Sequence, residues 1–174
     1  MKLSIKEIAL YAMLGTIMYA SKIVMDVLPN IHLIGMFVMA YTLVFRKKAL
    51  YPIYVFVFLT GLFGGFATWW VPYLYIWTLL WAAAMLIPRK TPGWLLCILC
   101  PVICSLHGFL YGILYAPAQA LMFGLDFKGM VAWIIAGFPY DIVHGIGNFV
   151  AGVLIVPLTQ LMKKLLSKTN LGFK

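Results

Sequence analysis

The sequence predicts an all-α membrane protein, a bundle of six transmembrane helices with both chain ends in the cytoplasm. The prediction rests on a very high apolar content, six long apolar segments, and basic residues gathered at alternate segment ends. Of the 174 residues, 65% are apolar and only 10% are charged, against roughly 25% charged residues in soluble domains. A soluble core of this size cannot bury so much apolar surface, so lipid must solvate most of the chain. No linker divides residues 1–174, which we expect to form one domain.

Six apolar segments approach the length of about 20 residues that a helix needs to cross about 30 Å of hydrocarbon. The second segment is short, which indicates little tilt or a start deeper in the membrane. Residues 117–136 are too mixed in polarity for a further span, and we expect an external loop with an interfacial helix there. The predicted spans are residues 8–25, 31–45, 49–67, 72–87, 94–115 and 137–161.

Basic residues are distributed as the positive-inside rule requires for six spans. With a cytoplasmic N-terminus, eleven Lys and Arg residues lie on the inner side and two on the outer side. Five or seven spans would place basic clusters on both sides of the membrane. The net charge of +9 is thus explained by topology, and we expect no nucleic-acid partner. The inner residues are Lys2, Lys6, Arg46, Lys47, Lys48, Arg89, Lys90, Lys163, Lys164, Lys168 and Lys174, and the outer ones are Lys22 and Lys128.

The first segment carries small residues at steps of four, Ala12, Thr16 and Ala20. Small residues at this spacing let another helix approach closely, which is the commonest way in which membrane helices associate. The stripe fits packing against a neighbouring span and equally fits a surface for a partner protein. The sequence leaves both interpretations open.

Aromatic residues are concentrated at the start of the fourth segment. Trp69 and Trp70 are typical of an aromatic belt at the outer membrane interface. Tyr73, Trp77 and Trp81 recur at steps of four and form an aromatic face deeper in the segment. This face either packs against lipid or provides a stacking wall for a flat ligand.

The sixth segment carries Asp141, His144 and Asn148 inside an otherwise apolar run. The spacing of three and then four residues places all three on one helical face. Polar groups inside a membrane helix normally face the protein interior or a water-filled pocket. Asp141, the one acidic residue predicted within a span, either contacts a ligand or has a structural role, as an internal salt bridge or by pinning a helix.

The fifth segment adds His107, Tyr111 and Tyr115, again at steps of four and in the outer half. Polar and aromatic stripes from the fourth, fifth and sixth segments therefore reach the same depth. This coincidence predicts a pocket that opens outward, with Gln119 as a further contact. Aromatic walls with a carboxylate, two imidazoles and an amide suit a flat heterocycle that carries hydrogen-bond donors or positive charge.

These features together resemble the substrate-binding S component of energy-coupling factor (ECF) vitamin transporters. The resemblance covers essentially the whole chain. Ala12-x-x-x-Thr16-x-x-x-Ala20 is the counterpart of the small residues, typically alanines, through which that family contacts its transmembrane coupling subunit, with Thr16 as a departure from alanine. The resemblance implies a ligand site built by the external first loop and the outer halves of the fourth to sixth helices.

The resemblance also implies a function. An S component captures a scarce water-soluble nutrient outside the cell and delivers it through one coupling subunit and two ATPase subunits. The partners would then be a small-molecule nutrient, those subunits and the lipid bilayer of a bacterial or archaeal plasma membrane. The sequence lacks a glycine-rich phosphate loop with the Gly-Lys-Ser/Thr ending, so we expect ATP hydrolysis in partner subunits and no cofactor here.

Two alternatives differ in mechanism. A stand-alone secondary transporter or channel would be favoured by broken helices paired between inverted halves, and the prolines show no such pairing. A membrane enzyme would use His107, His144 and Asp141 for metal binding or acid–base chemistry. The chain lacks a His-x-x-x-His or Glu-x-x-His ligand pair, so we do not expect an enzyme. Three closely spaced cysteines are expected to be buried thiols rather than a redox or metal site: Cys97, Cys100 and Cys104.

Overall fold

The computed structural model describes residues 3–168, which form α-helices and two short 3₁₀ helices, with no strand among them. A capping box begins the first helix, because the Ser4 side chain accepts from the Glu7 backbone and Glu7 reaches back to Ser4. Lys2 and Lys174, both counted above on the inner side, lie outside the described residues. The elements are α1 (Ile5–Met25), α2 (Ile34–Phe45), η1 (Arg46–Ala49), α3 (Leu50–Gly64), η2 (Thr68–Trp70), α4 (Tyr73–Met85), α5 (Gly93–Phe109), α6 (Tyr111–Phe123), α7 (Phe127–Gly152) and α8 (Ile155–Lys168).

Three stretches of helix are long and apolar enough to cross a membrane: α1, the joined α5–α6 stretch Gly93–Phe123, and α7. The helices α2, α3 and α4 have 12, 15 and 13 residues. At 1.5 Å per residue they measure roughly 18–23 Å, which is shorter than a hydrocarbon core of about 30 Å. The six predicted apolar segments are therefore all helical, but three of them fall short of the length of a full span.

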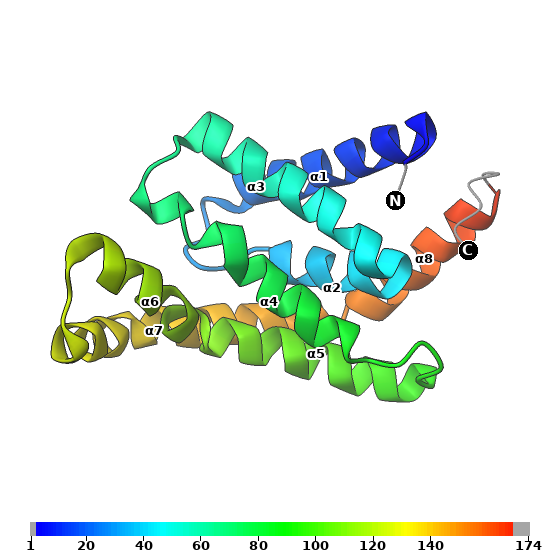
Figure 1. Ribbon diagram of the computed structural model, residues 1–174. Coiled ribbons are helices and arrows are strands. Elements are labelled where there is room, and N and C mark those ends of the chain that lie inside the picture. Colours follow the sequence, from blue (N-terminus) through cyan, green and yellow to red (C-terminus); the bar gives the residue numbers. More distant parts are fainter. Residues whose placement is uncertain (1–2, 169–174) are drawn as a thin grey trace.

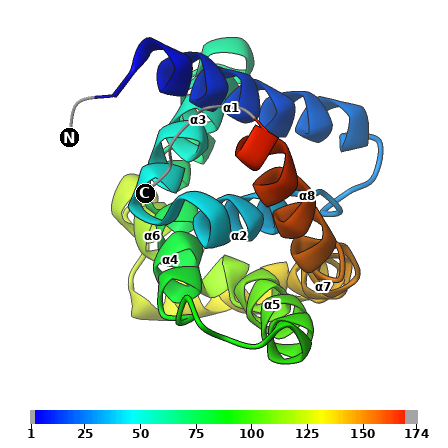
Figure 2. The ribbon, with the colours of Figure 1, turned by 90° about the vertical axis from the view of Figure 1, so that its right-hand side faces the viewer.

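The helices α5 and α7 run side by side, α1 and α8 cross the bundle at an angle to them, and α2 lies in the middle (Figures 1 and 2). Nine of the twelve α2 residues are buried, which agrees with contacts from α2 to α4, α5, α7 and α8. A helix that is apolar all round is expected at the centre of such a bundle. The other helices bury one face and leave large apolar side chains exposed on the other.

The start of α1, η1, the α4–α5 loop and α8 gather at one end of the bundle (Figure 1). Lys48 forms an ion pair with Glu7 of α1. The Arg46 guanidinium donates to the carbonyls of Met85 and Ile87, at 2.7 and 3.1 Å, and so holds η1 against the end of α4. We call this end, with Arg46, Lys47, Lys48, Arg89 and Lys163, the basic end. The opposite end, with Trp69, Tyr73, Tyr111 and Tyr115, is called the aromatic end.

Glycines let α5 and α7 meet backbone to backbone. A Cβ atom on Gly108 would lie 2.8 Å from the Cα of Gly145, and one on Gly152 would lie 2.6 Å from the Cα of Pro101. The Ser105 hydroxyl donates to the Gly145 carbonyl at 2.9 Å across the same contact. This close approach fixes the register of the two helices that carry the predicted polar stripes.

Residues 117–136 form a helical hairpin, so the helix predicted there is present, but the predicted loop is reduced to the turn at 124–126. The helix α6 continues to Phe123, Gly124 takes a left-handed conformation (φ 65°), and α7 already begins at Phe127. Asp126 caps α7 by accepting from the Gly129 backbone at 2.7 Å. The residues that made this stretch look mixed in polarity are thus the cap and first turn of a helix.

The predicted fifth and sixth segments are each interrupted. Leu110 separates α5 from α6, and a two-residue turn separates α7 from α8. The α8 helix that follows is amphipathic, with buried Ile155, Thr159 and Met162 on one face and lysines elsewhere.

The glycine contact gives a stability prediction. Replacing Gly108 by alanine should lower the stability of the detergent-solubilised protein by about 1–3 kcal/mol, because the new methyl group meets backbone that cannot move aside. Circular dichroism during heating measures the change. Gly137→Ala in α7 is the control, since nothing lies within 4 Å of its added Cβ atom. An equal effect of the two substitutions would contradict the proposed role of the contact.

Candidate functional site

A pocket of about 340 Å³ opens at the aromatic end, where the loop between α1 and α2 meets η2, α4, α6 and α7. Four residues predicted for a ligand site line it: Tyr73, Tyr111, Tyr115 and His144. The α1–α2 loop supplies most of the remaining wall, including His32. The pocket therefore combines the first loop with the ends of later helices that lie far from it in sequence.

Aromatic and imidazole rings form a connected layer below this pocket. The His144 ring centroid lies 4.7 Å from that of His32 and 4.8 Å from that of Tyr111. The Trp77 ring lies 5.8 Å from His32, 6.0 Å from Tyr111 and 5.7 Å from His107. Most of these pairs are edge-on or tilted, as ring quadrupoles favour. Rings of the predicted stripes, which come from α4, α5, α6 and α7, therefore contact one another.

Four ring nitrogens in this layer are buried without a hydrogen-bond partner among the described residues. They are His32 Nδ1, Trp77 Nε1, His107 Nδ1 and His144 Nε2. A buried polar group that lacks a partner costs roughly 1–3 kcal/mol, so such groups are rare in native proteins. Four of them in one layer indicate a place where donors and acceptors from outside the chain bind.

His32 was not singled out from the sequence, although it contacts more of this layer than any predicted residue of the first loop. It lies in the loop before α2, and its Nδ1 is buried without a partner among the described residues. A neutral imidazole offers one donor and one acceptor. A lone histidine at the start of an apolar segment carries no periodic signal, which is why sequence analysis missed it.

His107 and Trp77 lie beneath the pocket rather than in its wall. His107 is 7% exposed, and its Nε2 lies 3.2 Å from the Ile76 carbonyl of α4. Trp77 is only 1% exposed. These two residues connect the floor of the pocket to α4 and α5, so they reach a ligand only through the rings above them.

Asn148 lies one helical turn deeper than His144 and holds helices together. Its Nδ2 donates to the Cys104 carbonyl of α5 at 3.2 Å, while its Oδ1 has no partner among the described residues. A Cβ atom on Gly35 of α2 would lie 3.4 Å from the amide group. Asn148 therefore sits where α2, α5 and α7 meet, outside the walls of the pocket described above.

Asp141 binds a helix end. Both of its carboxylate oxygens accept from the Gly112 backbone N–H at 3.1 Å, at the start of α6 just after the break at Leu110. A carboxylate there satisfies an unpaired donor and complements the positive end of the helix dipole. The spacing of polar residues in α7 is thus confirmed as an inward face, with Asp141 6%, His144 3% and Asn148 1% exposed.

A second pocket of about 410 Å³ lies beside the first, between η2, α6 and α7. Gln119 and Asp141 line it, and Tyr111 and Tyr115 belong to both pockets. Trp133 stacks on Tyr115 with ring centroids 5.6 Å apart and lines the second pocket as well. Six of the nine predicted ligand-site residues are therefore divided between two neighbouring spaces that share a wall of tyrosines. The other three, Trp77, His107 and Asn148, line neither space.

The rim of the first pocket carries charges of both signs. Lys22 and Asp26, one turn apart at the end of α1, form an ion pair at 3.1 Å and line the pocket. Trp69, assigned above to an aromatic belt, contributes to the wall, and its carbonyl accepts from the Tyr115 hydroxyl at 2.7 Å. The rim thus offers a cation and an anion to a polar ligand.

The described residues hold no group of three or more His, Cys, Asp or Glu side chains arranged to bind a metal ion. Cys100 and Cys104 are buried, and Cys97 is exposed on the outside of α5. The arrangement at the aromatic end can stack on a flat molecule and exchange hydrogen bonds with it. No known protein family model, curated protein or solved structure matches this chain.

The role of Asp141 at the helix end can be tested directly. Asp141→Ala should destabilise the protein by about 1–2 kcal/mol, as loss of an N-cap does, because the Gly112 N–H loses its acceptor. Asp141→Asn should retain most of that stability, since an amide oxygen still accepts. Thermal unfolding in detergent compares the two variants. If asparagine destabilises the protein as much as alanine, the hydrogen bond to Gly112 is not the stabilising interaction, and the negative charge at the helix end is what matters.

Proposed function

We propose that this chain is the substrate-capturing membrane subunit of an ECF-type importer, and that the pocket at the aromatic end holds its cargo. The observation that carries the proposal is the pocket itself, whose wall of tyrosines also holds His32 and His144, each with a buried ring nitrogen that lacks a partner among the described residues. A volume of about 340 Å³, with about 410 Å³ beside it, suits a vitamin-sized molecule.

The topology supports the same proposal. In the proposed orientation, the basic end faces the cytoplasm, in keeping with the positive-inside rule, and the aromatic end faces outward. The six apolar segments then all lie within the bilayer, with α2, α3 and α4 as short helices that flanking residues and local thinning of the bilayer accommodate. The membrane is the plasma membrane of a bacterium or archaeon.

The small-residue stripe supports a partner in the membrane. Ala12, Thr16 and Ala20 are all exposed, whereas the face of α1 that packs on the bundle uses Tyr11, Gly15 and Met18. The Thr16 hydroxyl donates to its own helix at the Ala12 carbonyl, which leaves a smooth apolar surface. A coupling subunit that docks here would receive the cargo, and two ATPase subunits would drive its release.

The chemistry of the pocket limits the classes of molecule that can be its cargo. The imidazoles of His32 and His144, the tyrosine hydroxyls and the rim ion pair suit a flat heterocycle with donors and acceptors on its edge. Only Lys22 among the residues that line the first pocket is basic, and Asp26 already pairs with it. A doubly anionic ligand is therefore disfavoured.

The pocket assignment gives a binding prediction. Mass spectrometry of the purified protein identifies the small molecule that co-purifies, and calorimetry then measures its affinity. His144→Ala and His32→Ala should each weaken binding about tenfold or more, because each removes a buried hydrogen-bonding ring from the site. Ile146→Ala, at an exposed position of α7, is the control. Unchanged affinity in both histidine variants would exclude this pocket.

One observation favours a second function, a stand-alone transporter. The break at Leu110 makes α5–α6 a discontinuous helix, a feature that membrane transporters use at their substrate sites. Here the Gly112 N–H at the start of α6 already donates to Asp141, so it is not available to bind a cargo molecule. The uptake experiment below distinguishes the two functions.

Uptake should require the coupling module. Cells or vesicles that contain this chain with coupling and ATPase subunits should accumulate the co-purifying compound, and those with this chain alone should not. Thr16→Trp should abolish uptake but leave ligand binding intact, because the bulky ring blocks the stripe. Ile17→Trp, which is also exposed but points away from the stripe, is the control. ATP-independent uptake by the purified chain would instead establish the stand-alone transporter.

A further inference from the structure

The basic end contains a cleft of about 660 Å³ between η1, the α4–α5 loop and α8. Five basic residues line it: Arg46, Lys47, Lys48, Arg89 and Lys163. They come from three separate parts of the chain, so the fold rather than one basic run brings them together. The cleft lies at the opposite end of the bundle from the ligand pocket.

The cleft has almost no negative charge to balance the positive charge of these five residues. The chain has four Asp and Glu residues, and Glu7 alone reaches the basic end, where it pairs with Lys48. Asp26 pairs with Lys22, Asp126 caps α7 and Asp141 binds the start of α6. Within residues 3–168, the other four cations of the cleft therefore lack a carboxylate partner.

Hydrogen bonds hold the Arg46 side chain in place and leave some of its N–H groups unused. Two of its five N–H groups are used by the Met85 and Ile87 carbonyls, and its own carbonyl accepts from Trp81 at 3.1 Å. Its backbone takes a positive φ of 55°, which these contacts stabilise. Burial, with a smaller contribution from the charge of Arg89, lowers the pKa of Arg46. An anion between the two guanidinium groups would offset both effects.

Thr159 is an unusual threonine in the wall of the same cleft. It is 4% exposed, and its hydroxyl has no partner among the described residues. Three other helical threonines, Thr16, Thr42 and Thr60, each donate to the carbonyl four residues before them, at 2.9, 2.6 and 2.8 Å, and the Thr78 hydroxyl bonds to that of Tyr54. Thr159 makes no such bond, so its hydroxyl is a donor available to a ligand in the cleft.

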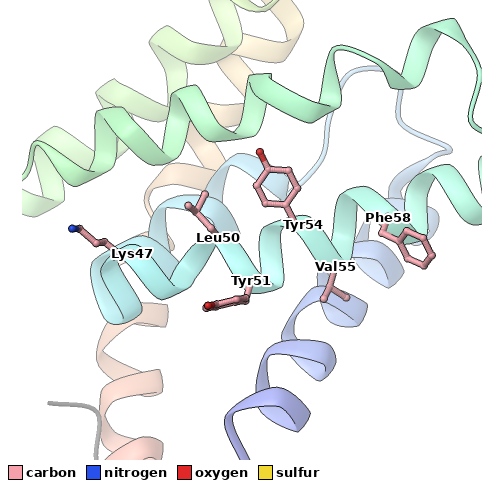
Figure 3. A pocket seen from close by; sticks show the side chains of 6 residues that line it. All are labelled: Lys47, Leu50, Tyr51, Tyr54, Val55 and Phe58. Carbon is pink, nitrogen blue, oxygen red and sulfur yellow. The ribbon is translucent and has the colours of Figure 1, made fainter. Parts of the chain in front are cut away.

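An apolar groove of about 620 Å³ begins at the same place. Lys47 lines both spaces, and from Lys47 the groove follows one side of α3 past Leu50, Tyr51, Val55 and Phe58 (Figure 3). A charged cleft next to an apolar groove suits a molecule with an anionic head and a hydrocarbon chain.

We propose that the cleft binds a phosphate group, and that its source is the headgroup of an anionic phospholipid whose chain lies in the groove along α3. Guanidinium groups, ammonium groups and a hydroxyl are the donors that phosphate oxygens take. The basic end lies at the height of lipid headgroups if the apolar helices are embedded in a bilayer.

Native mass spectrometry tests this site with phosphatidylglycerol and phosphatidylcholine of identical chains. The wild-type protein should retain phosphatidylglycerol in preference. The triple variant Lys47→Gln, Arg89→Gln, Lys163→Gln should lose about fivefold in affinity per cation removed. The control Lys90→Gln, Lys164→Gln, Lys168→Gln removes the same charge outside the cleft and should stay within about twofold of wild type. Thr159→Val, which changes no charge, should weaken retention about fivefold.

The results of these measurements distinguish a lipid headgroup, a soluble phosphate and diffuse attraction of charge. If inorganic phosphate raises the melting temperature of wild type but not of the cleft variant, and no lipid preference is seen, the phosphate site stands and its ligand is soluble. Equal losses in the two triple variants would mean that diffuse charge attracts lipid, and would overturn the proposal. So would the absence of any response to phosphatidylglycerol and to phosphate. Circular dichroism of each variant ensures that a loss reflects the site and not unfolding.

Discussion

The backbone contact between α5 and α7 is the constraint on which the rest of the structure depends. Gly108 lies against Gly145 so closely that no side chain fits between them. Because the two helices touch there, Ser105 and Asn148 reach across to backbone carbonyls. His107 and His144 also join one network of rings through Trp77 and Tyr111. Without this contact, the polar groups of the two helices would face each other across side chains instead of forming one layer.

The break at Leu110 is part of the same arrangement. A helix that stops and restarts leaves backbone N–H groups without acceptors, and in an apolar surrounding each of these is costly. Asp141, one turn before His144, supplies the acceptor for Gly112. The carboxylate is thereby satisfied by the chain itself, whereas the imidazole and indole nitrogens next to it are not. Because the ring nitrogens lack partners among the described residues and the Asp141 carboxylate does not, we infer that the rings, and not Asp141, bind a ligand.

The two ends of the bundle present opposite chemistry. At the aromatic end, rings and neutral polar groups surround a pocket whose rim charges are paired. At the basic end, five cations surround a cleft with one carboxylate nearby. Neither space is formed by one segment, since each combines a loop with helices that are distant in sequence. Polar groups collect at the ends because the apolar middle of the bundle gives them no partners.

The sequence by itself determined the helical class, the six apolar segments and the inward face of Asp141, His144 and Asn148, because helical periodicity and hydropathy are local properties. It also determined that Tyr73 and Trp77 share one helical face and that His107 and Tyr111 share another, since residues four apart lie on the same side of a helix. Only the tertiary structure decided that 117–136 is a hairpin, that Asp141 binds a helix end, and that His32 joins the pocket. It likewise decided that Ala12, Thr16 and Ala20 face outward. These outcomes depend on which segment meets which, and contacts between residues that are distant in the chain leave no periodic trace within either segment.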